Sequence, residues 1–103
     1  MIVKFAIRKS TQDKEIEILE LSNRSYGRLK GYTIETVGDI INKWNEIPKL
    51  RGMGATSVKE IASKVLDLAI SEMDEQQMSD FIIEMIKNNS VNDIKPIMDK
   101  ILN

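Results

Sequence analysis

The fold of this protein is decided by residues 47–61, which read IPKLRGMGATSVKEI. Pro48 suits the first turn of a short helix, where the amide hydrogen that proline lacks is not needed. The two glycines of residues 52–54 allow a tight turn and a close approach to a phosphate, and the methionine between them can insert into the core. Ser57 then opens a capping box, SVKE, which predicts the start of a second helix. Together these features predict a helix-hairpin-helix, in which the second helix directs its amide groups and the positive end of its dipole outward, toward an anion.

Two further helices are predicted before this segment. Ser22 can cap a helix that ends near Lys30, and Gly31 can supply the left-handed residue that closes it. Thr36 opens another capping box, TVGD, for a helix with one apolar face. That face is formed by Val37, Ile40, Ile41 and Trp44. After the hairpin, helical spacing predicts a stripe of core residues at Val58, Ile61, Val65, Leu66 and Ala69.

The N-terminal segment alternates apolar and polar residues. The first alternation places Val3, Phe5 and Ile7 on one face and Lys4, Ala6 and Arg8 on the other. A polar stretch, STQD at residues 10–13, follows it, and residues 15–18 (EIEI) alternate again. Such alternation predicts two strands joined by a turn. We therefore expect an N-terminal β-hairpin, whose unpaired edge would suit a homodimer.

The last third has helical spacing twice. Residues 78–86 and 94–102 each carry an apolar face, and Pro96 places the start of the final helix near Asp93. The pattern predicts an αα-hairpin with four of the six methionines, which either fill a core or line an adaptable groove for a partner. The predicted fold is mainly α: a helix-hairpin-helix core of four or five short helices at 22–70, a β-hairpin at 1–21 and an acidic C-terminal helix pair at 71–103 packed on the core.

The residue types present restrict the chemistry. The sequence has no cysteine and no histidine, so it lacks thiolate ligands, disulfides and the commonest general base. Asp39, Glu60, Asp80 and Glu84 stand at capping or ordinary solvated positions, and no nucleophile lies in a suggestive motif. The short N-terminal apolar run is interrupted by Lys4, which argues against a signal peptide or a membrane span. We therefore expect a cytoplasmic protein that is not an enzyme and that uses no cofactor or metal.

The charge is divided unevenly along the sequence. Residues 1–64 contain 12 Lys and Arg against 8 Asp and Glu, whereas residues 65–103 contain 3 against 8. This division permits a phosphate-facing surface on the basic part, supported by Lys49, Arg51, Lys59 and Lys64 near the hairpin. The same division is also compatible with two solvated faces that carry no function.

Three separated motifs together resemble a known family. Residues 17–30 (EILELSNRSYGRLK), 36–39 (TVGD) and 50–61 (LRGMGATSVKEI) are similar to the C-terminal domain of the bacterial RNA polymerase alpha subunit. The resemblance covers about residues 15–68 and implies binding to the minor groove of A·T-rich DNA, with contacts to sigma factor and regulators. Nothing in the sequence resembles the large N-terminal assembly domain of that subunit, so we expect a free-standing relative.

The resemblance also implies roles for individual residues. Arg24 stands at the position of the arginine that enters the minor groove, and Glu20 matches an acid that the family turns toward sigma. The DNA-binding residues expected from the motif and the hairpin are Arg24, Arg28, Arg51, Gly52, Gly54, Thr56, Ser57, Lys59 and Glu60.

The sequence departs from the family pattern at several of these positions. Gly27 replaces a DNA-contacting asparagine, and Ala55 and Thr56 stand where the family usually has basic residues. Arg28, one residue beyond Gly27, can partly compensate for the missing asparagine. Ile18 stands where the family has an acid beside the sigma contact, so that contact is also weakened. Because each lost phosphate contact lowers affinity, we expect weak DNA binding. The alternative is a protein-interaction module that keeps the fold but has lost DNA binding, and that docks on polymerase or a regulator.

Overall fold

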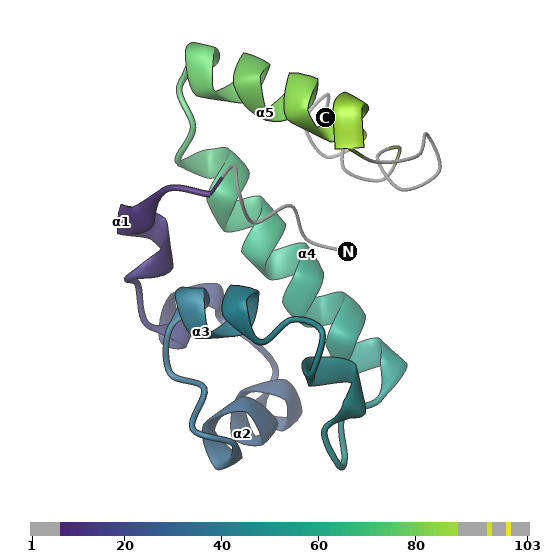
Figure 1. The fold of residues 1–103 in the computed structure, drawn as a ribbon. Helices are drawn as coiled ribbons and strands as arrows, with labels where there is room; N and C mark the ends of the chain where they lie inside the picture. Colours follow the sequence, from purple (N-terminus) through teal and green to yellow (C-terminus); the bar gives the residue numbers. More distant parts are fainter. Residues whose placement is uncertain (1–6, 89–94, 96–98, 100–103) are drawn as a thin grey trace.

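A computed structural model describes residues 7–88 together with Lys95 and Asp99. Helix α4, Ala55–Ser71, is the long axis of the molecule, and the smaller elements α1, α2 and α3 lie along one side of it (Figure 1). Helix α5, Glu75–Asn88, lies at the C-terminal end of α4, away from α2 (Figure 1). The remaining elements are α1 Lys9–Gln12, η2 Ile16–Leu19, α2 Asn23–Gly31, α3 Val37–Asn42 and η3 Ile47–Lys49. The mainly helical prediction is confirmed.

The helix-hairpin-helix core packs around α4. Its stripe is buried as predicted, with Ile61 and Val65 fully buried and Ala69 nearly so, whereas Val58 is only partly buried. Met53 enters the same core from the hairpin, which confirms that the methionine between the glycines inserts into the interior. Pro48 lies at the start of the short helix η3, as its missing amide hydrogen requires.

The N-terminal β-hairpin prediction is wrong for the part of the sequence that the structure describes. Residues predicted as its turn and second strand form α1 and the 3-10 helix η2, and residues 1–6 of the first strand lie outside the described residues. Ile16 and Leu19 are buried while Ile18 is 51% exposed, which is the i, i+3 period of a 3-10 helix. A strand would have placed Ile16 and Ile18 on the same face. Without this strand the basis for a homodimer through a hairpin edge is lost.

One short extended contact remains in this region. Glu15 and Thr36 form an isolated antiparallel bridge, flanked by hydrogen bonds from Ile16 N to Glu35 O and from Val37 N to Lys14 O, both 2.9 Å. Ile7, Ile16 and Leu19 belong to the same core cluster as the helices. The N-terminal segment is therefore packed into the domain, although the predicted boundaries at residues 21 and 70 stay a prediction.

Helix α2 begins and ends close to the predicted residues, but the residue that closes it differs from the prediction. The Ser22 hydroxyl accepts a hydrogen bond from the Ser25 amide, which confirms the predicted cap. Gly31 is the last helical residue, and the left-handed conformation falls on Thr33, at φ 59°. The amides of Thr33 and Ile34 donate to the carbonyls of Lys30 and Leu29, which is the Schellman pattern of hydrogen bonds. The glycine expected at the left-handed position is thus two residues too early.

The two predicted capping boxes have different outcomes. The box at Thr36 is present: its hydroxyl accepts from the Asp39 amide, and Asp39 accepts from the Thr36 amide. The prediction of a capping box at Ser57 is wrong, because α4 begins at Ala55, with Gly54 as its N-cap and no side-chain cap. The carboxylate of Glu60, which would have completed that box, reaches α2 instead.

The first half of the predicted αα-hairpin is described as α5. A reciprocal pair of bonds starts this helix, with the Asp74 carboxylate accepting from the Gln77 amide and the Gln77 side chain accepting from the Asp74 amide. Phe81 is its buried anchor. The final helix predicted from Asp93 lies outside the described residues, except for Lys95 and Asp99. Within the part that the structure describes, no helix is both long and apolar enough to cross a membrane.

Candidate nucleic-acid interface

Helix α2 presents two arginines on one exposed face. The helix buries Ser25 and Leu29 against the core, so Arg24 and Arg28, which are four residues apart, are exposed on another face of it. Together with Asn23 and Gly27 they line a shallow hollow. Gly27 leaves open space there, because a Cβ added to it would meet no atom within 4 Å.

The hairpin lies directly against Arg28. Gly52 has φ 83°, and a Cβ at this position would be 2.7 Å from both Cζ and Nε of Arg28. The Arg28 guanidinium therefore lies on the bare backbone of Gly52, a contact that only glycine permits. The Tyr32 hydroxyl donates a 3.2 Å hydrogen bond to the Arg51 carbonyl, which is a second link between α2 and the hairpin.

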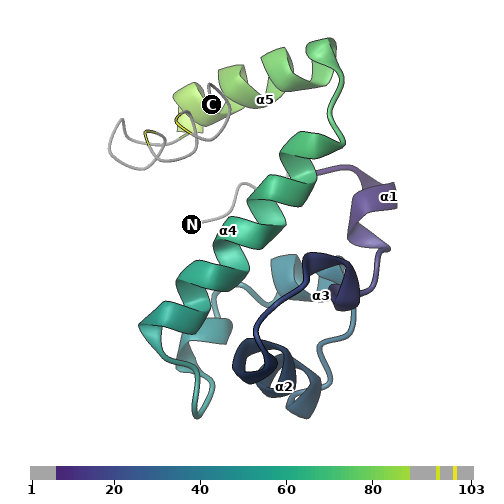
Figure 2. The same cartoon turned by 180° about the vertical axis from the view of Figure 1, so that it is seen from behind.

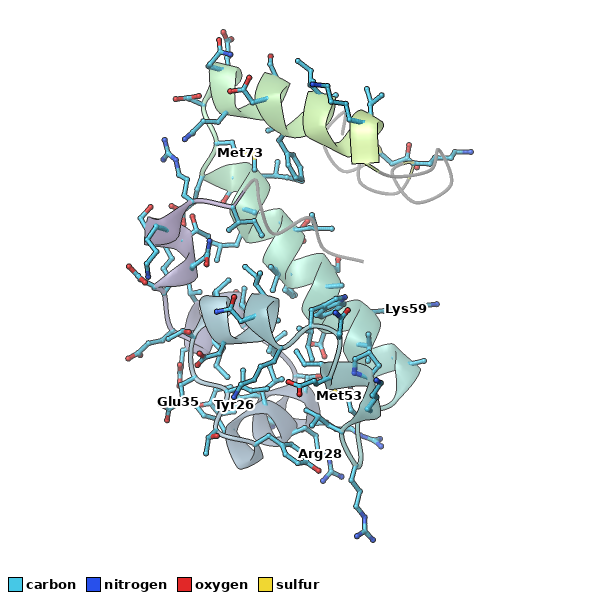
Figure 3. The ribbon with its side chains drawn as sticks, in the orientation of Figure 1. Tyr26, Arg28, Glu35, Met53, Lys59 and Met73 are labelled. Carbon is cyan, nitrogen blue, oxygen red and sulfur yellow. The ribbon has the colours of Figure 1, made fainter. Side chains whose placement is uncertain are left out.

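These contacts join α2 and the hairpin into one surface. A second hollow, which shares Gly27 and Arg28 with the first, is completed by Gly31, Tyr32, Arg51 and Gly52. We call the combined set the arginine–hairpin surface. Its members are Asn23, Arg24, Gly27, Arg28, Gly31, Tyr32, Arg51 and Gly52. Figure 3 shows Arg28 at the end of the molecule formed by α2 and the hairpin, where Met53 marks the buried side of the turn.

The N-terminus of α4 follows the hairpin immediately. The first hydrogen bond of the helix runs from Val58 N to Gly54 O, at 3.1 Å. The amides of Ala55, Thr56 and Ser57 therefore have no acceptor within the helix. The N-cap residue, Gly54, has no side chain that could accept a hydrogen bond from them. Amides at such a helix end, together with the positive end of the dipole, favour an anion. The Ser57 side chain itself is buried, so any contribution of this residue to an outside ligand comes from its backbone.

Glu60 fastens α4 to the start of α2. Its carboxylate accepts hydrogen bonds from the Ser22 amide at 2.7 Å, from the Ser22 hydroxyl at 2.8 Å and from the Ser25 hydroxyl. These bonds, first of all the one from Ser25, hold the pKa of Glu60 below its ordinary value. Because its negative charge is used in these bonds, Glu60 stabilises the packing beneath Arg24.

The predicted DNA-binding residues are only partly brought together. Arg24, Arg28, Arg51 and Gly52 lie on the arginine–hairpin surface, and Gly54 and Thr56 are exposed next to it at the start of α4. Lys59 extends outward from α4, away from the Arg28–Gly52 contact (Figure 3). Glu20 is exposed at φ 51°, directly after η2.

Two features of the site were not anticipated from the sequence. Tyr32 lies on the arginine–hairpin surface with 39% of its area exposed, and the only sequence signal was an aromatic residue at a helix end. A cluster behind this surface joins η2 to α2. Glu17 accepts from the Tyr26 hydroxyl at 2.6 Å and pairs with Lys30 at 3.2 Å. The bond from Tyr26 lowers the pKa of Glu17 and raises that of Tyr26.

Charge supports an anionic ligand in this region. Residues 22–64 contain eight Lys and Arg against four Asp and Glu. Two of the four acids are occupied, because Asp39 caps α3 and Glu60 binds α2. Helix α5, which begins with acidic residues, lies at the opposite end of α4 and leaves the arginine–hairpin surface uncovered by the described residues (Figure 2). Within the same described part, no group of acidic side chains is arranged to hold a metal ion.

Known proteins match the same part of the sequence. The family model for the C-terminal domain of the bacterial RNA polymerase alpha chain matches residues 5–67. The DNA-directed RNA polymerase subunit alpha of Carboxydothermus hydrogenoformans is 35% identical over 82 residues, which cover 73% of this chain and 26% of that protein. The same subunit of Syntrophomonas wolfei is 38% identical over 76 residues, covering 67% and 24%. That of Fervidobacterium nodosum is 37% identical over 60 residues, covering 57% and 18%.

The matched region spans about a quarter or less of the length of these curated relatives. No solved structure matches the protein significantly. The family model nevertheless covers more than half of the residues, including α2, the hairpin and most of α4. The protein therefore belongs to the family of the C-terminal domain of the bacterial RNA polymerase alpha subunit, a non-catalytic DNA-binding module of transcription.

Proposed function

We propose that the protein binds double-stranded DNA weakly through the arginine–hairpin surface, with Arg24 in the minor groove of an A·T-rich segment. The observation that carries this proposal is the contact of Arg28 with Gly52, which combines arginines from α2 and from the hairpin into one exposed surface. Narrow A·T minor grooves concentrate negative potential, which favours a guanidinium there.

The neighbouring groups have complementary roles in this proposal. Arg28, Arg51 and the amides that follow Gly54 contact phosphates, which position the protein without reading sequence. Glu60 acts from behind as a positioning residue for α2, and Lys59 adds positive potential at a distance. Binding is weak because Gly27, Ala55 and Thr56 carry no cationic or amide side chain to extend the contact.

A second function, contact with polymerase, sigma factor or a regulator, is favoured by a different surface. Ile18 is 51% exposed and lies close in sequence to the exposed Glu20, at the end of η2. An exposed isoleucine next to an acid is suited to a protein partner. We propose this contact as an addition to DNA binding, in a protein that acts in the cytoplasm.

The decisive experiment measures fluorescence anisotropy with A·T-rich and G·C-rich duplexes over a salt series. Arg24→Ala should weaken binding to the A·T-rich duplex about tenfold and reduce the preference for it, since one good groove contact contributes about 1–3 kcal/mol. Arg8→Ala is the matched control. It removes the same charge from an exposed arginine near α1, where the ion pair with Asp74 at 4.0 Å contributes little.

Equal weakening by both substitutions would show that only net charge matters. Absence of binding even at low salt would leave the protein contact as the function. A pull-down with polymerase core, comparing the wild type with Ile18→Asp, would then test that second function.

A further inference from the structure

Helix α5 is apolar on two faces. Its inner face buries Phe81, which is 1% exposed. On the outside, Ile83 and Ile86 are 50% and 59% exposed, and with Ser79 and the partly buried Ile82 they follow the i, i+3, i+4, i+7 spacing of a single stripe. We call these four residues the outer stripe of α5. Large adjacent apolar side chains on a surface helix indicate a contact with another polypeptide.

The outer stripe is separate from the proposed DNA contact. It lies on the helix at the far end of α4 from α2 (Figures 1 and 2). The family model for the polymerase domain ends at residue 67, before α5 begins. The stripe therefore lies outside the part of the sequence that the family model covers.

Charges beside the stripe indicate what covers it. Asp80 and Lys87 are both exposed and lie seven residues, two helical turns, apart, so they share one edge of the stripe. When two identical helices pack antiparallel about a two-fold axis, each edge faces the same edge of the other copy. A register that places Ile82 opposite Ile83 of the other copy brings Lys87 within two residues, about 3 Å along the axis, of the other copy's Asp80. Because of the two-fold symmetry, this pair of opposite charges occurs twice in the dimer.

A parallel arrangement lacks this complementarity. In a parallel two-fold pair the edge that carries Asp80 and Lys87 faces the opposite edge of the other copy, so neither residue meets its opposite charge. Opposite charges across a helix pair select partner and orientation. The pattern therefore favours an antiparallel pair of identical helices.

We propose that the outer stripe of α5 is the contact surface for a second copy of this protein, which binds with its own α5 antiparallel. Four small or apolar positions per copy make a small interface, so the dimer dissociates on dilution. The inference does not depend on DNA binding, because the two surfaces lie at opposite ends of α4.

The test is the concentration dependence of the mass of the 103-residue protein, measured by sedimentation equilibrium. The mass should rise from 11.8 kDa toward twice that value as the protein is concentrated. Ile83→Asp should weaken the dimer at least tenfold, because it places a carboxylate in the middle of an apolar contact. Ser10→Asp, which adds the same charge to exposed α1, should leave the dimer unchanged.

Charge reversal tests the orientation. Asp80→Lys and Lys87→Asp should each weaken the dimer about fivefold, since each creates like charges across the interface twice, and the double variant should restore it. Circular dichroism establishes that each variant is folded.

Three results would overturn the proposal. One is a monomer at every concentration, with Ile83→Asp lowering the stability of that monomer, as expected if residues 89–103 of the same molecule cover the stripe. Another is a dimer that is insensitive to Ile83→Asp. The third is a dimer in which the double charge reversal fails to restore association.

Discussion

Thr33 holds a backbone conformation that disfavours β-branched residues. Its φ of 59° lies in the left-handed region, at the position that closes α2 and that glycine commonly occupies. The residue is exposed, and its hydroxyl donates a hydrogen bond to the adjacent carbonyl of Tyr32. The hydrogen bonds that close α2 require the left-handed conformation at this position whichever residue is present. Threonine therefore makes the folded protein less stable than glycine would at this turn.

Thr33→Gly should stabilise the protein. Relief of the left-handed strain, about 1–2 kcal/mol, outweighs the added backbone entropy of glycine in the unfolded state, so a net gain of about 1 kcal/mol is expected. For a protein of this size that gain raises Tm by about 4–8 °C. Calorimetry of Thr33→Gly and of Thr33→Ser, which keeps the hydroxyl and a Cβ in the left-handed conformation, distinguishes this explanation from loss of the hydrogen bond. An unchanged or lower Tm for the glycine variant would contradict it.

Gly27 is a second residue whose replacement tests the proposed function, because it should change the affinity for DNA. It lies within α2 between Arg24 and Arg28, with open space where a side chain would extend. Gly27→Asn should increase affinity for A·T-rich DNA about two- to tenfold, the contribution of one hydrogen bond of about 0.5–1.5 kcal/mol. Gly27→Ala is the control, because it also improves helix propensity and adds no amide. Equal affinities of the two variants in the anisotropy assay would exclude a contact at this position.

At the scale of secondary-structure elements, the joint between α2 and α4 depends on Glu60. One carboxylate satisfies the Ser22 amide and two hydroxyls from the start of α2. Arg24 lies between Ser22 and Ser25 in the sequence, and the hairpin contacts α2 toward its other end, at Arg28 and Tyr32. The relative placement of the two helices, and with it the shape of the arginine–hairpin surface, is therefore set by a residue that is itself acidic.

The pH dependence of stability should report on this joint. The pKa of Glu60 is lowered in the folded protein, so its stabilisation is complete above the ordinary glutamate pKa of about 4.3 and is lost as the pH falls through the lower, folded value. Glu60→Gln should reduce the free energy of unfolding by about 1–3 kcal/mol at neutral pH. This difference should shrink in acid, because the wild type then loses the same charge.

Urea denaturation from pH 7 to pH 3 measures the effect. Glu46→Gln, at an exposed carboxyl, should run parallel to the wild type over the whole range. A constant difference between wild type and Glu60→Gln at all pH values would mean that the carboxylate charge is not the source of the stabilisation. The capping carboxylate of Asp39, whose pKa is lowered by the Glu35 and Thr36 amides, contributes to acid sensitivity in both proteins alike.

At the scale of the whole molecule, charge is segregated along α4. The net charge is −1, but the described acidic helix α5 and the arginine–hairpin surface lie at opposite ends (Figure 2). Because exposed charges are screened beyond about 8–10 Å at physiological salt, the acidic end has little influence on a phosphate bound at the other. A protein of nearly neutral charge can therefore bind DNA at one end.

The salt dependence of DNA binding should reflect this local charge. With three arginines at the surface, the logarithm of the binding constant should fall against the logarithm of salt concentration with a slope of about −2 to −3. Arg51→Ala should make that slope shallower by about one, and Arg8→Ala, near α1 and Asp74, should leave it unchanged. A slope near zero, or equal effects of the two substitutions, would show that the hairpin does not meet phosphates.

The local elements were largely predictable from the amino-acid sequence. The cap at Ser22, the capping box at Thr36, the proline turn at Pro48 and the burial of Met53 depend on residues close together in the sequence. Such features are decided by local hydrogen bonds and by backbone preferences, which a sequence displays directly. The resemblance carried by the same residues placed the protein in its family.

The arrangement of these elements in space was decided by tertiary contacts. EIEI at residues 15–18 matches a strand, yet packing of Ile16 and Leu19 into the helical core selects a 3-10 helix. Glu60 matches a local capping box, but it finds better donors on α2, 35 to 38 residues away. Arg28 meets Gly52 for the same reason: the position of a side chain relative to a distant segment depends on how the helices pack, and the spacing of residues along the sequence does not contain that information.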